Sequence, residues 1–242
     1  MQTNNKNSPL LSDCSHCLLA NNCMPSGFPD DSVYLFKNIV NTNIKYKSSE
    51  IVYHQGEPTR HVYIVKSGSF KTFIKNDDQS EHITGFYLPG DCISMENMAE
   101  GVSLNTAQAV EDSLLCIADY PLLTKYRKEF PLLSDLAIKV YSGSLARSQD
   151  FLSCLAQPCA ANRLATFLLI MLKRYNAMRA EQNDFQLNMS RQDIANYLGL
   201  AVETVSRSFS RLVDTGCITK KNRYICITNK EKLQQLASSQ EA

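Results

Sequence analysis

Three cysteines lie close together near the start of the sequence. Cys14, Cys17 and Cys23 form a Cys-x2-Cys-x5-Cys array. Thiolates at close spacing are the ligands that bind soft metal centres, including iron-sulfur clusters and tetrahedral zinc. The array therefore predicts a metal centre of this kind in the N-terminal segment.

A second group of polar residues lies near the other end of the chain. Ser190 and Asp193 form a capping-box-like start: the hydroxyl can accept a hydrogen bond from an orphan backbone N–H, and the carboxylate favours the positive end of a helix. We expect this helix to run to Leu198, where Gly199 supplies a tight turn into a second helix at residues 202–214. Two short helices joined in this way predict a helix-turn-helix.

The second helix has a face suited to DNA bases. Its core-facing residues are apolar, namely Val205, Phe209 and Leu212. This leaves Glu203, Ser206 and Arg207 outward near its N-terminal end, where a recognition helix meets base edges, and Thr204 in the same turn joins them as a candidate contact. Arg207 can donate two hydrogen bonds to guanine, Glu203 can accept one from cytosine, and Ser206 can reach a base or a phosphate.

A basic hairpin follows the second helix. Residues 219–227 have a hairpin pattern, and Lys220, Lys221 and Arg223 lie near its tip, where they suit DNA phosphates. A purely structural helix pair would explain each feature alone, but not the cap, the glycine turn, the outward polar residues and the basic wing together. We therefore predict a winged helix-turn-helix that binds double-stranded DNA.

Short β-rich stretches occupy much of the sequence before this module. They lie at residues 45–47, 51–53, 62–65, 70–74, 82–88 and 106–117, with turn-forming residues between them. Many short alternating strands at about ten-residue spacing predict an antiparallel sandwich or barrel, and a jelly roll of two Greek keys suits their number.

A helical pattern begins after Pro131. Its seam residues recur at spacings of 3, 4, 3, 4 and 3 residues: Ile138, Tyr141, Leu145, Ser148, Leu152 and Leu155. This period is typical of a coiled-coil seam, so we expect the helix to pair with the same helix of a second copy. The alternative is a single amphipathic helix packed on its own barrel. Gly143 within the seam argues against the paired helix, because glycine weakens a helix by about 1 kcal/mol relative to Ala. Gln157-Pro158 ends or bends it, and another helix follows at residues 160–179.

The composition favours two domains in a reducing compartment. A chain of 242 residues with 44% hydrophobic content can bury one large core and a smaller one. Neither a membrane span nor a secretory signal is indicated, because the sequence has no run of about 18 apolar residues and residues 1–12 have no apolar stretch. We therefore expect a cytoplasmic protein, in which the nine cysteines are ligands or buried small side chains rather than disulfides.

The charge distribution is uneven along the chain. Residues 1–159 hold 13 Lys and Arg against 17 Asp and Glu, a net charge of −4, whereas residues 160–242 hold 12 against 7, a net charge of +5. A basic C-terminal third suits a polyanion-binding module joined to a sensor. An enzyme is not predicted, because we find no phosphate loop, Ser/His/Asp set or paired carboxylates, and the four histidines are scattered.

Over nearly its whole length the chain resembles the CRP/FNR superfamily of bacterial transcription regulators, and within it the oxygen-sensing FNR branch. The segments that carry the resemblance are the cysteine array, residues 107–116 and residues 196–207. The resemblance implies an α+β chain with four parts. They are a cysteine cluster-binding segment (1–30), a cyclic-nucleotide-binding-type β jelly roll (31–130), a dimerisation helix (131–158) and a winged helix-turn-helix domain (159–242).

The same resemblance implies a function and its ligands. It implies an oxygen-labile 4Fe-4S cluster on Cys14, Cys17, Cys23 and Cys116, which governs a homodimer in the anaerobic or oxygen response. Glu203, Ser206 and Arg207 would read palindromic TTGAT-type half-sites, with RNA polymerase as a further partner.

Ligand chemistry leaves alternatives at this site. A cluster of this kind takes four thiolates, so the fourth must come from a strand or loop that folds beside the array. The resemblance favours Cys116, although spacing alone equally offers Cys92. Four thiolates also make a zinc site, although Cys-x5-Cys is wider than the usual spacing. The alternative is therefore a regulator of the same type with a zinc or thiol site that answers another effector.

Two features depart from the family pattern. The CRP branch holds cyclic AMP with a Gly-Glu element and an Arg-Ser pair, but residues 90–98 lack that Glu register and residues 103–108 contain no Arg. Because an unneutralised phosphate in a pocket is costly, we do not expect a cyclic nucleotide. FNR proteins commonly have an acidic residue at the position of Ser148, so a neutral serine there weakens the expectation of complete oxygen-driven monomerisation.

Overall fold

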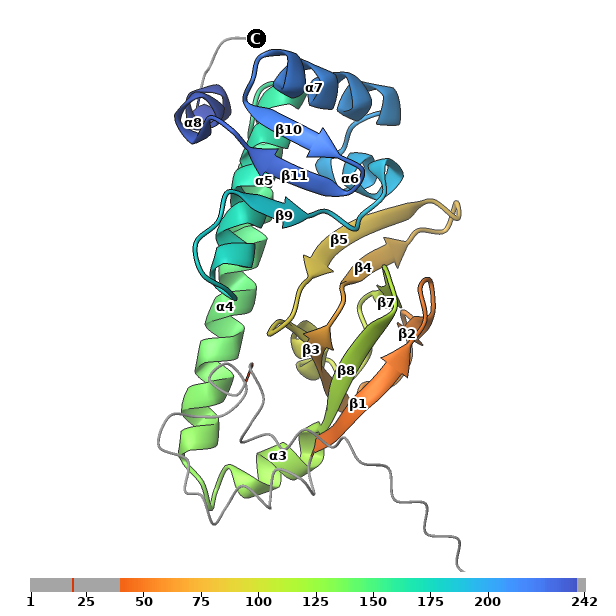
Figure 1. Ribbon diagram of the computed structural model, residues 1–242. Helices are drawn as coiled ribbons and strands as arrows, with labels where there is room; N and C mark the ends of the chain where they lie inside the picture. Colours follow the sequence, from red (N-terminus) through yellow and green to blue (C-terminus); the bar gives the residue numbers. More distant parts are fainter. Residues whose placement is uncertain (1–18, 20–39, 239–242) are drawn as a thin grey trace, which may run out of the picture.

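The computed structural model describes residues 40–238 together with residue 19, the side chains of residues 41 and 42 excepted. A β-roll is followed by a long helix that runs along its side and leads into a mainly helical C-terminal domain (Figure 1). The array formed by Cys14, Cys17 and Cys23 lies outside the described residues.

The β-roll consists of two four-stranded antiparallel sheets. The first has the order β1-β8-β3-β6, with β1 at Val40–Tyr46, β8 at Ser113–Asp119, β3 at His61–Ser67 and β6 at Cys92–Ile93. The second has the order β2-β7-β4-β5, with β2 at Ile51–Tyr53, β7 at Thr106–Ala109, β4 at Phe70–Lys75 and β5 at Glu81–Tyr87. Apolar side chains from both sheets fill the space between them, among them Val65, Phe70, Ile93, Ala107 and Leu115. The predicted jelly-roll fold is therefore confirmed.

The stretch at residues 106–117, predicted as one strand, is two strands in different sheets. The chain turns at Glu111 and Asp112 between β7 and β8. The Asp112 carboxylate accepts a hydrogen bond from the Ser48 backbone N–H at 3.0 Å, and Val110 N donates to the carbonyl of Ser69 at 2.9 Å. These long-range bonds satisfy the polar groups of the turn, and the local sequence does not predict them.

A β-bulge shapes the outer face of the second sheet. Phe73 pairs with Ile83 and Thr72 pairs with Gly85, so that Thr84 is an additional residue in β5. In a regular strand Ile83 and Phe86 would point to opposite faces. Here both are 3% exposed and belong to the same buried cluster, since the bulge changes the alternation.

Helices connect the roll to the C-terminal domain. The Asp119 side chain accepts from Leu122 N and caps α3 (Tyr120–Tyr126), and α4 (Leu132–Leu155) follows. Pro158 lies in the break between α4 and α5 (Ala160–Asn176). The 3-10 helix η3 (Met95–Met98) follows β6.

The C-terminal domain combines helices with a small sheet. Strands β10 (Ile218–Lys221), β11 (Tyr224–Ile227) and β9 (Asp184–Gln186) pair in that order and are antiparallel. The helices are α6 (Arg191–Leu198), α7 (Val202–Asp214) and α8 (Lys230–Ser238). Helix α8 was not predicted from the sequence.

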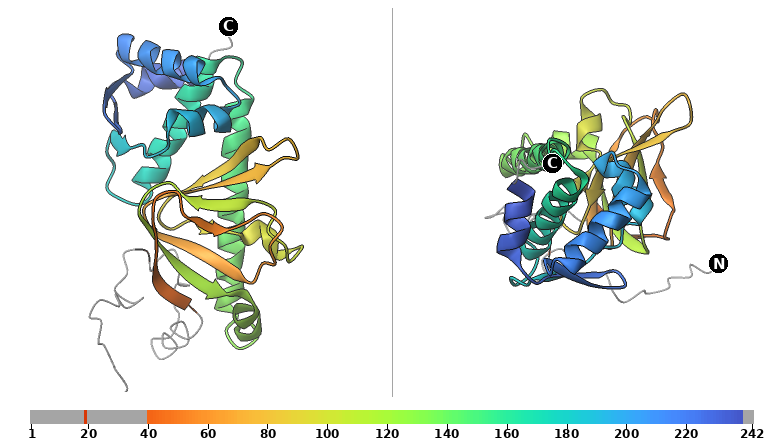
Figure 2. Two further views of the ribbon diagram at one scale, coloured as in Figure 1. Left: turned by 90° about the vertical axis from the view of Figure 1, so that its right-hand side faces the viewer. Right: turned by 90° about the horizontal axis from the view of Figure 1, so that it is seen from above.

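The two domains share one core. The largest buried apolar cluster joins residues of the C-terminal helices to four residues of β4, β5 and the turn after it: Phe73, Ile83, Phe86 and Leu88. The ring of Phe86 lies 6.4 Å from that of Phe167 on α5 and 4.9 Å from that of Tyr197 on α6. Two views agree that α6 lies against β4 and β5 (Figures 1 and 2).

A shared core predicts that the two domains unfold together. Phe86→Ala should lower the free energy of unfolding by about 3–5 kcal/mol and split the calorimetric transition into two, because it opens a cavity between the domains. Phe70→Ala removes a ring that is 0% exposed inside the roll and should cost a similar amount without splitting the transition. Two transitions in the wild-type protein would contradict a shared core.

Candidate nucleic-acid interface and cysteine site

The start of α6 is fixed by a capping box. Ser190 Oγ accepts from Asp193 N at 3.0 Å, and Asp193 Oδ2 accepts from Ser190 N at 3.1 Å. At the other end Gly199 has a φ of 63°, a left-handed conformation that glycine adopts without steric cost. Cap and glycine together produce the predicted turn into α7.

Helix α7 presents its polar face outward. Val205, Phe209 and Leu212 are 0%, 4% and 0% exposed, so they anchor one side of the helix in the shared core. On the opposite side Glu203, Ser206 and Arg207 are exposed, and Thr204 is partly exposed. This helix lies at the end of the molecule remote from α3 (Figure 1). The four side chains can therefore enter a DNA groove without rearrangement of the domain.

The wing carries exposed cations. Strands β10 and β11 pair Lys221 with Tyr224, so that Asn222 and Arg223 form the turn, and Asn222 has a positive φ of 56°. Lys220, Lys221 and Arg223 are all exposed. The structure thus brings the predicted basic residues to the hairpin next to α7.

Arg191 is a candidate contact that the sequence analysis missed. Its guanidinium carbon lies 3.2 Å from the centre of the Phe209 ring, and burial lowers the pKa of Arg191 to about 10. Burial and the nearby charge of Arg191 also lower the pKa of Lys220. Neither cation has an ion-pair partner among the described residues, so both are available for a phosphate. A cation at the positive start of a helix is unfavourable by itself, which is the signal that could have identified it.

Cys116 faces away from the interior of the roll. Along β8 the buried residues Ser113 and Leu115 alternate with it, and Leu115 lies in the inner core. Cys116 is half-buried, and it lies opposite Ile64 of β3. Strand β1 begins at Val40, which pairs with Ala118, so the N-terminal segment joins the sheet two residues along β8 from Cys116.

Cys92 shares this outer face but has a different environment. It also pairs with Ile64, which places Cys116, Ile64 and Cys92 in one row across three strands. Burial, with a smaller contribution from Asp91, raises the pKa of the Cys92 thiol to about 12. Metal ligands bind as thiolates, and the burial of Cys92 disfavours that form. Within residues 40–238 no three His, Cys, Asp or Glu side chains are grouped to hold a metal ion.

A polar network lies where the sequence lacks the Arg of the CRP branch. Asn105 Oδ1 accepts from the Tyr53 hydroxyl at 2.9 Å, and its Nδ2 donates to Glu96 Oε1 at 2.9 Å. Tyr53 and Asn105 are 6% and 5% exposed. These polar groups therefore bond to one another inside the roll.

Helix α4 has an apolar stripe on its surface. The exposed fractions of Ile138, Leu145 and Leu152 are 64%, 62% and 62%, and Tyr141 is 42% exposed. Ser148 is exposed and Leu155 is half-buried. Most of the predicted seam thus lies on an exposed side of α4, although Ser148 also lines a pocket between α4 and β5. Among the described helices, none combines the length and apolar character needed to cross a membrane.

Comparison with known proteins gives the family. Residues 43–129 match the model of the cyclic nucleotide-binding domain, and residues 162–236 match that of the Crp-like helix-turn-helix domain. The transcriptional regulatory protein btr of Bordetella pertussis is 34% identical over 95% of each chain. The fumarate and nitrate reduction regulatory protein of Escherichia coli is 30% identical over 93% of this chain and 90% of its own.

A solved structure supports the same assignment. FixK2 from Bradyrhizobium japonicum is 30% identical, with a TM-score of 0.74, and the match covers 84% of this chain and 100% of that one. The relatives are regulators rather than enzymes, which confirms the prediction of a non-enzymatic protein. The chain therefore belongs to the CRP/FNR family of DNA-binding transcription regulators.

Proposed function

We propose that the chain is a homodimeric regulator of the anaerobic or oxygen response, whose DNA binding depends on an oxygen-labile 4Fe-4S cluster on Cys14, Cys17, Cys23 and Cys116. The observation that carries this proposal is the place of Cys116. It lies on the outer face of β8, beside the strand through which the N-terminal segment joins the roll. The name of the Escherichia coli relative, a fumarate and nitrate reduction regulator, points to the same response.

The donor set fits such a cluster. Three closely spaced thiolates in one segment and a fourth on an adjacent strand match its need for four sulfur ligands, and the bound cluster would supply the oxygen-sensitive group. The outer face that carries Cys116 also contacts the dimer helix, since Val140 of α4 packs against the cluster of Val62, Met95 and Ala118. Release of the N-terminal segment from Cys116 would therefore alter a surface that supports α4.

The exposed stripe on α4 favours a parallel pair of helices. Large apolar side chains in a continuous stripe are usually covered by a partner, and their spacing fits a coiled coil. Pairing would set the two α7 helices on successive turns of DNA, about 10 base pairs apart. Such a dimer would act in the cytoplasm, with RNA polymerase as its expected partner.

The exposed face of α7 is compatible with the half-site that the family resemblance implies. A TTGAT-type half-site has one G·C pair, whose guanine suits Arg207 and whose cytosine suits Glu203. Ser206 and Thr204 lie beside them, and the phosphates on either side would contact Lys220, Lys221, Arg223 and Arg191. We do not expect a cyclic nucleotide, because the polar groups near Asn105 already bond to one another.

The alternative keeps the fold and the DNA target but assigns zinc, or a metal-free thiol site, to the cysteines. Cys116 would serve either metal, since zinc also takes four thiolates. About four iron atoms and about four acid-labile sulfides per monomer would identify the cluster, whereas zinc without sulfide would identify the alternative.

Two substitutions separate base reading from phosphate binding. Arg207→Ala should cost about 1–3 kcal/mol at the guanine and relax specificity there. Lys221→Ala should weaken all duplexes similarly and lower the slope of log affinity against log salt by about 1. Fluorescence anisotropy at several salt concentrations measures both effects, with TTGAT duplexes and with duplexes in which the G·C pair of the half-site is replaced. Uniform weakening by Arg207→Ala would rule out its role in base reading.

Cysteine variants test the fourth ligand. In anaerobically purified protein, Cys116→Ser should lose iron, sulfide and visible absorption as completely as Cys17→Ser does, because each removes one of four ligands. Cys92→Ser should retain the cluster, since the resemblance assigns the fourth ligand to Cys116 and the burial of Cys92 disfavours its thiolate. A cluster that persists in Cys116→Ser shows that another residue is the fourth ligand. Wild-type protein that is colourless and free of iron, yet binds DNA equally before and after air, argues against the cluster itself.

Adjacent residues on α4 test the dimer seam. Leu145→Glu should weaken dimerisation by about 100-fold or more, because two apolar side chains per dimer are lost from the seam. Ala146→Glu adds the same charge at an exposed position outside the predicted seam and should leave the dimer intact. Sedimentation equilibrium measures both, and equal effects of the two variants would contradict the seam.

A further inference from the structure

One face of α6 contacts both the β-roll and α4. Asp193, Asn196 and Tyr197 have the spacing that places side chains on one side of a helix, and we call them the α6 docking face. They contact, in order, Lys71 of β4, the backbone of β5, and Phe151 of α4. The helix immediately before the recognition helix is thus held by the two elements that would carry a signal.

Asn196 pairs with the edge of a sheet. Strand β5 is the outer strand of its sheet, so one row of its backbone groups has no neighbouring strand. Asn196 Oδ1 accepts from Ile83 N at 2.7 Å, and Asn196 Nδ2 donates to the carbonyl of Glu81 at 2.7 Å. The carboxamide therefore makes the two hydrogen bonds that a further strand would make, which fixes α6 at one position along β5.

Lys71 ties the start of α6 to β4. Its Nζ lies 2.6 Å from Asp193 Oδ1, and both side chains are 16% exposed. Burial by itself raises the pKa of Asp193, but hydrogen bonds from Lys71 and Ser190 outweigh it, so the pKa lies below its usual value. The other carboxylate oxygen of Asp193 closes the capping box. One carboxylate thus begins the helix and docks it.

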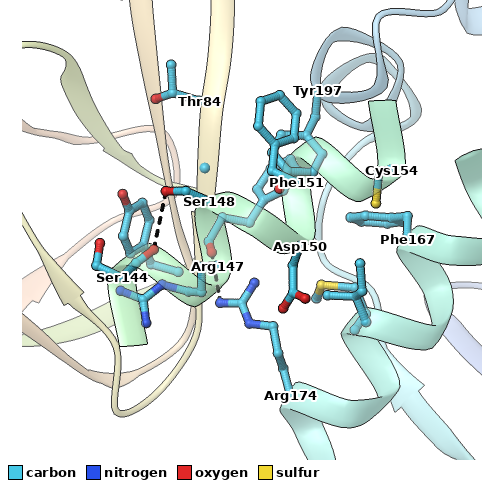
Figure 3. Close-up of a pocket in the computed structure, with 15 residues that line it drawn as sticks. Thr84, Ser144, Arg147, Ser148, Asp150, Phe151, Cys154, Phe167, Arg174 and Tyr197 are labelled. Atoms are coloured by element: carbon cyan, nitrogen blue, oxygen red, sulfur yellow. Dashed lines mark hydrogen bonds between the residues drawn. The ribbon is translucent and has the colours of Figure 1, made fainter. Parts of the chain in front are cut away.

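Tyr197 extends the contact to α4. Its ring lies 4.4 Å from that of Phe151, which precedes the seam residue Leu152. Figure 3 shows these two rings beside a pocket whose walls come from β5, α4, α5 and α6. The pocket has a volume of about 70 Å³, so apolar packing does not fill the junction of the domains.

We propose that the α6 docking face sets the position of the recognition helix relative to the dimer axis, and that Asn196 is a positioning residue for DNA binding. The contact is not inhibitory, because Glu203, Ser206 and Arg207 stay exposed while α6 is docked. The TTGAT-type operator of this proposal rests on the proposed function.

The docking face should matter for two half-sites and not for one. A single recognition helix reads its half-site whatever the position of its domain. A dimer gains affinity from the second half-site only when the distance between the two α7 helices matches the DNA. Loss of docking should therefore reduce the gain in affinity from the second half-site. It should also reduce the difference in affinity between duplexes with different half-site spacings.

The experiment compares variants of the full chain, prepared anaerobically. Asn196→Ala removes the bonds to β5, and Lys71→Met removes the ion pair from the side of the β-roll. Asn176→Ala is the control for the first, because the Asn176 carboxamide makes the same two bonds to the backbone of Gln182 within its own domain. Lys47→Met is the control for the second, since Lys47 pairs with Asp112 of the same domain at the surface of the β-roll, away from α6.

Three duplexes serve as probes. One has two inverted TTGAT half-sites about 10 base pairs apart between centres, one has a spacer two base pairs longer, and one has a single half-site. Both docking variants should bind the first about tenfold more weakly than wild type, stay within about twofold on the single half-site, and discriminate less between the two spacings. Both controls should behave as wild type.

Other outcomes overturn the proposal. These are wild-type affinity of the docking variants for the first duplex, tighter binding, or equal losses on all three duplexes. Hydrogen exchange tests the docking without DNA. The Ile83 amide should exchange about tenfold faster in Asn196→Ala than in the wild type, and at the wild-type rate in Asn176→Ala. If the exchange rate of the Ile83 amide is unchanged in Asn196→Ala, the docking itself is overturned. If the wild-type protein does not bind TTGAT duplexes, only the proposed operator is overturned.

Discussion

Burial of the outer face of β4 and β5 beneath the C-terminal helices is the contact on which the arrangement of the molecule depends. Three side chains of the β-roll pack into the core of the other domain: Phe73, Ile83 and Phe86. Without this burial the two domains would be joined mainly through the break at Pro158. Because the core is shared, the roll and the reading helix have a defined relation within one protomer.

The β-roll has two outer faces, and each contacts a different part of the chain. The face of β8, β3 and β6 presents Cys116 and packs against Val140 of α4. The face of β4 and β5 packs against α6. Asp91 lies between them, next to Cys92, and its carboxylate accepts hydrogen bonds from Arg147 of α4 at 3.2 Å and Arg174 of α5 at 2.5 Å. A continuous set of contacts therefore connects the sheet that carries Cys116 with both long helices, and double-mutant cycles across Asp91 measure whether energy is coupled along it.

Local signals in the sequence were sufficient for the reading module but not for its docking. Ser190, Gly199 and the apolar spacing of α7 act within a few residues, so the helix-turn-helix is predictable from the sequence alone. Asn196 bonds to residues more than a hundred positions away, and the bulge at Thr84 reverses the alternation that places Ile83 and Phe86. Arg191 was missed because its contact with Phe209 needs the folded helix pair. The three N-terminal cysteines were found by spacing alone, and they lie outside the described residues.

Apolar and polar contacts have different roles at the junction. Burying an aromatic or aliphatic side chain contributes about 1.5–3 kcal/mol, so the cluster around Phe86 supplies most of the stability that holds the domains together. Such contacts have little directional preference. A hydrogen bond contributes only about 0.5–1.5 kcal/mol, but its geometry is narrow. The bonds of Asn196 and Asp193 therefore select one orientation among those that the apolar cluster permits. Orientation would matter for the proposed dimer on two half-sites, because a displacement of α7 along the groove changes which bases its side chains meet.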